Sequence, residues 1–160
     1  MKYLFIEVEV FVRDFNSRYL LALEAASRGY EVLVGHRNQI YDLALKNRLP
    51  RGIIHKKDLN TTPDELKNME KLIKKGFIFT SQDEESGILH NSYEDFSKRR
   101  FDNLNATNLF SYFFTWGDRD KDYFSKKLPN SRCQFVSTGS PRIDLCKYKF
   151  QIKNKYFSQK

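Results

Sequence analysis

The sequence is poor in cysteine, histidine, glycine and proline. It has two cysteines, Cys133 and Cys146, and three histidines among 160 residues. Two cysteines cannot build a disulfide framework, and without nearby histidine they cannot complete a zinc site. Seven glycines and four prolines exclude a collagen-like chain or a linker. We therefore expect two reduced thiols and a core that folds without disulfides or metal.

Long apolar runs are also missing, and none approaches the roughly 20 residues of a membrane-spanning helix. The apolar N-terminal segment is interrupted by Glu7, Glu9 and Arg13. A secretory signal would not carry these charges, and no small-residue cleavage site follows. We expect a cytoplasmic protein that at most touches the surface of the inner membrane.

Three sequence motifs that define common α/β proteins are absent. No GxGxxG follows the first expected strand, which disfavours a dinucleotide-binding fold. There is no GxxxxGK[ST] phosphate loop and no GxSxG nucleophile elbow. His55-Lys56-Lys57 stands where a phosphoacceptor receiver domain would need an aspartate.

The net charge of +8 is distributed unevenly along the chain. Residues 145–160 contain five lysines and no acid, so they carry +5 and the first 144 residues carry +3. A basic tail can bind anionic lipid or nucleic acid, and it can equally be a solvated end or a linker. The body of the chain does not resemble a polyanion binder, so no nucleic acid partner is expected. We expect a domain over 1–146 and a basic tail or interdomain linker over 147–160.

Strand-like and helix-like segments alternate from the first residues, and 14 Phe and 9 Tyr supply material for a core. This alternation predicts an α/β fold, with a doubly wound, mainly parallel, Rossmann-like sheet. Thr62, Pro63 and Glu65 form a strong helix start, and Gly29 and Gly76 are placed to end helices. The expected strands are 3–10, 31–35, 52–55, 77–81, 109–115 and 133–137, and the expected helices are 19–28, 39–48, 63–75, 93–100 and 120–127.

Ligands of open α/β sheets bind beyond the carboxyl ends of the strands, so the polar residues there are the candidate site. Glu7 lies within the first strand, where a carboxylate must be paired or face a cleft. It is either a catalytic or substrate-orienting acid, or it or Glu9 forms a salt bridge with Arg13. His36 and Arg37 follow the second strand and could hold a phosphate or carboxylate, or form a surface turn.

Two further segments carry candidate site residues. The acidic turn Gln82–Gly87 holds three adjacent carboxylates, which repel one another and so raise the pKa of at least one. A carboxyl group of that kind suits general acid or base chemistry, although an exposed turn is the alternative. Trp116 can pack against a sugar ring or cover the sheet. The segment Thr138–Asp144 could bind an anion, or Arg142 and Asp144 could form a structural arrangement.

Taken together, four segments resemble bacterial surface-carbohydrate biosynthesis proteins, which are GT-B glycosyltransferases with two Rossmann domains. IEVEVFVRDFNSRYLLALEAASRGYEVLVGHR resembles the family's opening, and FTSQDEESG its acidic turn, with Ser86 inserted. FFTWGDRDKDYF resembles its Trp-Gly segment, and VSTGSPRIDL its TGxPRxD segment. The order and spacing match over about residues 2–145.

The resemblance implies transfer of a sugar from a nucleotide donor onto lipopolysaccharide, capsule or O-antigen. This chain would be the N-terminal, acceptor-side half of such an enzyme, incomplete without a second Rossmann domain. The alternative is a stand-alone α/β binding module whose basic tail contacts an anionic partner. The implied partners are a glycan or lipid-linked acceptor and a second domain or chain, with a nucleotide sugar as co-substrate and no cofactor or metal. The candidate catalytic residues are Glu7, Asp83, Glu84 and Glu85, and the candidate substrate-binding residues are Arg13, Asp14, His36, Arg37, Trp116, Gly139, Ser140, Arg142 and Asp144.

Overall fold

Parallel strand pairing organises the whole chain. The computed structural model describes residues 2–59, 61–84 and 104–147, and in them six strands form one all-parallel sheet flanked by helices. This confirms the predicted α/β, Rossmann-like doubly wound architecture. The expected helix over 93–100, Glu85 and the tail beyond Lys147 lie outside the described residues.

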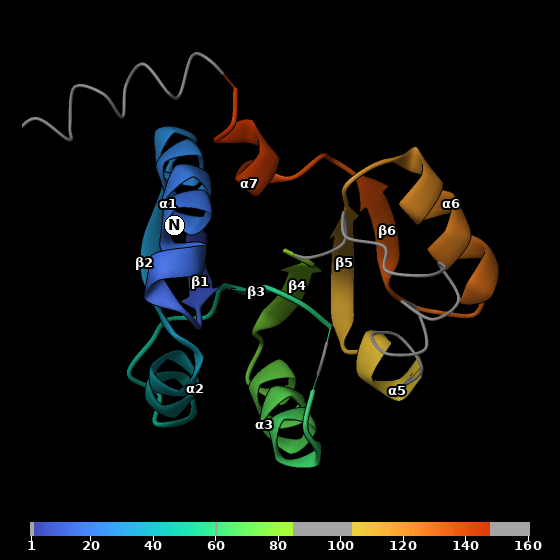
Figure 1. Cartoon of the computed structure of the whole chain (residues 1–160). Helices are drawn as coiled ribbons and strands as arrows, with labels where there is room; N and C mark the ends of the chain where they lie inside the picture. Colours follow the sequence, from blue (N-terminus) through green and yellow to red (C-terminus); the bar gives the residue numbers. More distant parts are fainter. Residues whose placement is uncertain (1, 60, 85–103, 148–160) are drawn as a thin grey trace, which may run out of the picture.

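The strands and helices alternate as the sequence pattern predicts (Figure 1). The strands are β1 (Lys2–Val8), β2 (Tyr30–His36), β3 (Ile53–Lys56), β4 (Ile78–Gln82), β5 (Phe110–Thr115) and β6 (Gln134–Ser137). The helices are α1 (Phe11–Ser27), α2 (Arg37–Leu45), α3 (Pro63–Lys74), α5 (Leu104–Thr107), α6 (Asp118–Lys127) and α7 (Pro141–Asp144).

The strand order is β2-β1-β3-β4-β5-β6. The chain moves from β1 to β2 in one direction and from β2 across β1 to β3 in the other. Because parallel crossovers are right-handed, α1 and α2 must cover opposite faces of the sheet. The strand order therefore reverses between β1 and β3, and this is the position at which open α/β sheets bind ligands.

Two apolar clusters lie on the two faces of the sheet. The larger contains Phe79 and Phe113 from the sheet with Ile40 of α2, Met69 of α3 and Phe124 of α6. The smaller packs Leu4 and Ile6 of β1 against Ala22 and Ala25 of α1. Helix α7 lies beside α1 (Figure 1), and among the described residues the first face is covered by α2, α3 and α6.

The structure corrects two expectations at the start of the chain. The first helix begins at Phe11 and not near Tyr19. Its first turn is stabilised by the Val10 backbone N–H, which donates to Asp14 Oδ2 at 2.9 Å. The rings of Phe11, Phe15 and Tyr19 also stack at four-residue spacing, with centroids 4.4 and 5.5 Å apart.

The second correction concerns the exposure of β1. The alternation of apolar and acidic residues suggests one apolar face and one polar face. Leu4 through Val8 are instead all buried, because β1 is an interior strand between β2 and β3 with helices on both faces. Glu7 is therefore an interior carboxyl group, and Glu9 lies beyond the end of the strand.

Gly52, just before β3, lies so close to β1 that there is no room for a side chain. A Cβ there would lie 2.6 Å from the Tyr3 carbonyl oxygen and 2.9 Å from Phe5 Cε2. We expect Gly52→Ala to lower the free energy of unfolding by about 1–3 kcal/mol in urea titrations. Gly35→Ala is the control, since its Cβ would meet only ordinary contacts at 3.5 Å or more. It should be neutral or stabilise by about 0.4–1 kcal/mol, and equal losses at both positions would contradict this packing.

Candidate functional site

The carboxyl ends of β4, β5 and β6 are connected to one another by hydrogen bonds. The indole Nε1 of Trp116 donates to the Asp83 carbonyl oxygen at 2.7 Å. Gln82 Nε2 donates to the Gly139 carbonyl oxygen at 2.5 Å. Arg142 Nη1 donates to the Glu84 carbonyl oxygen at 3.4 Å. The acidic turn, the Trp-Gly segment and the Thr138–Asp144 segment therefore meet at one edge of the sheet.

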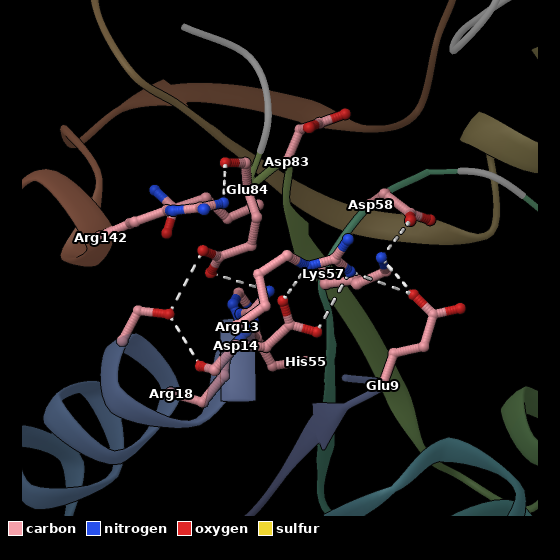
Figure 2. A network of polar contacts seen from close by, with 12 residues as sticks. Glu9, Arg13, Asp14, Arg18, His55, Lys57, Asp58, Asp83, Glu84 and Arg142 are labelled. Atoms are coloured by element: carbon pink, nitrogen blue, oxygen red, sulfur yellow. Dashed lines mark hydrogen bonds and ion pairs between the residues drawn. The ribbon is translucent and has the colours of Figure 1, made fainter. Parts of the chain in front are cut away.

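A buried ion pair joins this edge to α1 (Figure 2). Arg18 Nη2 lies 3.1 Å from Glu84 Oε1, and the two side chains are 1% and 5% exposed. Ser17 Oγ also lies within hydrogen-bond distance of Glu84 Oε2, at 3.3 Å, and donates to the Asp14 carbonyl. Burial lowers the pKa of the Arg18 guanidinium, and the Glu84 carboxylate opposes that effect.

Two of the three carboxylates predicted in the acidic turn, Asp83 and Glu84, lie in the described part of the chain. The carboxyl groups of Asp83 and Glu84 point in different directions in Figure 2, and Glu84 is paired with Arg18. Both residues are buried, so the alternative of an exposed acidic turn is wrong for them. Glu85 lies outside the described residues. Glu84 thus anchors the turn, while the Asp83 carbonyl holds Trp116.

A second group of charges surrounds the start of α1. Arg13 Nε donates to Asp14 Oδ1 at 2.7 Å, and Arg13 Nη2 lies 3.6 Å from Glu9 Oε2. Lys57 pairs with Glu9 and lies 3.8 Å from Asp58 Oδ2 (Figure 2). The predicted alternative of a salt bridge to Arg13 is thus found for Glu9. Burial raises the pKa of Asp14, but the hydrogen bonds from Arg13 and Val10 leave it below its ordinary value.

Glu7 lies on the opposite face of the sheet, among Tyr41 of α2, Lys56 of β3 and Glu65 of α3. Burial raises the pKa of Glu7 to about 7, while Lys56 acts in the opposite direction and Glu65 in the same one. Its Oε1 atom has no hydrogen-bond partner in the described part of the chain. Glu7 can therefore exchange a proton near neutral pH, as a general acid or base must.

The side chains of His36 and Arg37 have different partners. His36 is the N-cap of α2, and its Nδ1 accepts from the Asn38 backbone N–H at 3.3 Å. Arg37 Nη1 donates to Glu65 Oε2 at 3.2 Å, and Lys56 pairs with the same carboxylate. Arg37 thus belongs to the surroundings of Glu7, and the two residues do not form one anion site.

The segment after β6 holds the remaining candidates. Ser140 is buried and precedes the four-residue helix α7, without a side-chain capping hydrogen bond. Asp144 pairs with Lys147, while Arg142 reaches Glu84. Arg142 and Asp144 therefore have separate partners.

Sequence reasoning did not predict several residues with contacts at the site, among them Arg18, His55, Lys56 and Glu65. All four are polar or charged residues that the structure buries. Such a residue needs a buried partner, and that need is the only local signal of its role.

Two searches of the described residues returned no feature of their kind. Over 2–59, 61–84 and 104–147, no group of three His, Cys, Asp or Glu side chains could hold a metal ion. Within the same ranges, no helix has both the length and the apolar character needed to cross a bilayer.

Comparison with known proteins identified no relative: no protein-family model, no curated protein and no solved structure matches the chain.

Glu7 should make stability depend on pH. The unfolded chain loses this proton near pH 4.5 and the folded chain near pH 7, so the folded state binds more protons between them. The free energy of unfolding should fall as pH rises through that window, by about 3 kcal/mol in total, and level off above it. Urea titrations from pH 4 to 8 measure this slope.

The matched variants for this effect are Glu7→Gln and Glu31→Gln. Glu7→Gln should remove most of the slope, while the exposed carboxylate of Glu31 on β2 serves as the control. An unchanged slope in Glu7→Gln would show that another group causes it.

The Arg18–Glu84 pair should be strongly coupled. Arg18→Met or Glu84→Gln alone leaves the other charge buried and should cost about 3–5 kcal/mol of unfolding free energy. The double variant should lose less than the sum, by about 0.5–3 kcal/mol. The exposed Arg28–Glu24 pair is the control, and removing either partner there should cost at most about 1 kcal/mol. Additive losses for Arg18 and Glu84 would contradict the pairing.

Proposed function

We propose that this chain is the acceptor-side Rossmann-like half of a nucleotide-sugar-dependent glycosyltransferase of bacterial surface polysaccharide biosynthesis. Its product would be lipopolysaccharide, capsule or O-antigen. The domain over 1–146 would work together with a second Rossmann domain, on the same or another polypeptide.

One observation carries this proposal: the segments behind the sequence resemblance converge in space. They are far apart in sequence, yet the start of α1, the acidic turn, the Trp-Gly segment and the Thr138–Asp144 segment meet at one sheet edge. Parallel pairing alone brings segments that follow strands to one edge. The specific support for the proposal is therefore the set of side-chain contacts that join these segments, from Arg18 to Glu84, from Trp116 to Asp83 and from Arg142 to Glu84.

The electrostatics of the edge support an acceptor-side role. Arg13, Arg18 and Lys57 each have a carboxylate partner, so the edge does not present them as free cations to a diphosphate. Arg142 differs, because its hydrogen-bond partner at 3.4 Å is the neutral Glu84 carbonyl. The second domain would then supply most donor contacts, and Arg142 would orient the substrate.

Glu7 is the carboxyl group whose pKa, about 7, best suits proton transfer. Because it is buried on the face of the sheet covered by α2 and α3, the acceptor hydroxyl would have to reach it over the carboxyl end of β1. In glycosyl transfer, the acceptor hydroxyl loses its proton as its oxygen forms the new bond to the donor's anomeric carbon. The nucleotide diphosphate leaves with the electrons of the broken bond. A carboxylate with a pKa near 7 can accept that proton at neutral pH. Asp83 and Glu84 would hold the turn, and Glu85 remains a prediction.

The proposal also assigns a location and partners. The enzyme would act in the cytoplasm, in peripheral contact with the inner membrane where a lipid-linked acceptor resides. Its substrates would be a nucleotide sugar and a glycan or lipid-linked acceptor, without a cofactor or nucleic acid.

The test is a transfer assay with radiolabelled nucleotide sugars and membranes that carry the endogenous acceptor. The chain is assayed alone and together with a second Rossmann domain encoded beside it. We expect transfer only by the pair, and a loss of roughly 100-fold or more in rate for Glu7→Gln. Donor binding by this chain alone should be no tighter than about millimolar.

Glu31→Gln on β2 is the control and should keep the wild-type rate. Folding of each variant is verified by circular dichroism. Micromolar donor binding by the isolated chain would contradict the half-enzyme assignment, as would the absence of any chain-dependent transfer. A wild-type rate for a folded Glu7→Gln variant would remove the catalytic role of Glu7.

A further inference from the structure

The face of the sheet on which α1 packs contains a groove of about 810 Å³. Its walls are α1 on one side and the segment from Thr138 to Asp144 on the other, and its floor is formed by the side chains of β3, β4 and β5 that face away from the larger core. Ligand sites typically measure roughly 300–1,000 Å³, so the groove has the size of one. It extends from Ile53 at the start of β3 to Gln82 and Gly139 at the carboxyl edge.

Aromatic rings form part of the floor. Tyr112 and Phe114 alternate with the core residue Phe113 on β5, so both face the groove. Their rings are nearly parallel, at 4°, with centroids 6.2 Å apart, and Tyr112 is 39% exposed. His55 lies beside them, with its ring centroid 6.0 Å from that of Phe114.

The floor also contains His55, a buried residue with one ring nitrogen that has no hydrogen-bond partner among the described residues. His55 Nδ1 lies 2.9 Å from Thr80 Oγ1, and both residues line the groove. His55 is 4% exposed, and its Nε2 has no hydrogen-bond partner among the described residues. Burial, and then the charge of Arg18, hold the pKa of His55 well below its ordinary value, so the ring is neutral.

Each charged residue of the groove has a partner of opposite charge. Arg28 Nη2 lies 2.6 Å from Glu24 Oε1, and Asp144 pairs with Lys147. Arg28 is the only cation among the described lining residues, and its guanidinium is engaged by Glu24. The groove is therefore close to electrically neutral and does not favour an anion.

We propose that this groove binds a neutral oligosaccharide chain, with sugar rings against Tyr112 and Phe114 and a hydroxyl group at His55 Nε2. The site lies mainly on the sheet face and reaches the carboxyl edge at Gln82 and Gly139. Its identification as the place where the acceptor glycan lies rests on the proposed function, but the binding itself does not.

Three features select a sugar over other ligands. The C–H faces of a pyranose ring are apolar and can cover an aromatic ring, whose contact area contributes strongly to binding. A hydroxyl group both donates and accepts, so it satisfies His55 Nε2 in either neutral tautomer. An acyl or prenyl chain would leave His55 Nε2 buried without a partner, which is costly, and a nucleotide diphosphate would find no free cation on the described lining.

Calorimetry of the whole chain with chitotetraose, maltotetraose and mannotetraose tests the proposal. We expect at least one to bind, and Tyr112→Ala to weaken its affinity by about tenfold or more. Tyr19→Ala is the matched control, because Tyr19 is a similarly exposed tyrosine, at 49%, that does not line the groove. The Tyr19→Ala variant should bind the tetrasaccharide with the affinity of the wild type.

Two-dimensional NMR with the bound tetrasaccharide provides a second readout. The resonances of His55 and Tyr112 should shift, while those of Tyr19 should not. The proposal is overturned if no probe binds the folded chain, if Tyr112→Ala binds as well as the wild type, or if the shifts lie elsewhere. It is also overturned if light scattering shows a dimer that Tyr112→Ala dissociates, because a second copy would then cover the groove.

These outcomes are independent of the transfer assay. If a tetrasaccharide binds in the groove and the paired domains transfer no sugar, the groove proposal stands and the proposed function fails. If transfer proceeds and no tetrasaccharide binds, the groove proposal fails and the proposed function stands.

Discussion

The buried ion pair between Arg18 and Glu84 is the interaction on which the candidate site depends. Removing two charges from water costs several kcal/mol for each ion, and only a close partner in the interior offsets that cost. Arg18 comes from the second turn of α1, and Glu84 follows β4. The pair therefore fixes the first helix and the central turn relative to each other across the reversal point of the sheet.

The position of that turn determines the rest of the edge. Two consecutive backbone carbonyls, those of Asp83 and Glu84, accept hydrogen bonds from Trp116 and Arg142. The Glu84 side chain, paired with Arg18, holds the turn in which both carbonyl groups lie. A contact that stabilises the fold thus also aligns segments that follow three different strands.

Much of the fold could be predicted from the sequence because its signals are local. The helix start at Thr62 is confirmed by its side chain, whose Oγ1 accepts from the Glu65 N–H at 3.3 Å. Gly29 and Gly76 adopt φ values of +84° and +91°, as a helix end with glycine requires. The early start of α1 was missed because it depends on a side-chain contact to Val10 and on ring stacking, and no single residue type reports either.

The site was harder to predict than the fold. Parallel pairing guarantees that residues after the strands share an edge, so the general location followed from the strand pattern. Side-chain partners do not follow in this way. Glu84 and Arg18 are 66 residues apart, and Glu7 and Asp83 have carboxyl groups in different surroundings although both residues lie at the ends of strands. Spacing in the sequence cannot distinguish these cases.

The strand order also has a consequence for how the molecule assembles. β1, α1 and β2 form a local unit, because they are consecutive in the chain and β1 pairs with β2 over seven residues. The site needs contributions from Arg18 to Arg142, so it joins parts of the chain that must close long loops before they meet. Parallel sheets of this kind fold slowly because non-local contacts form late. The contacts of the site close longer loops than those of the β1–α1–β2 unit, so we expect the site to become ordered after that unit.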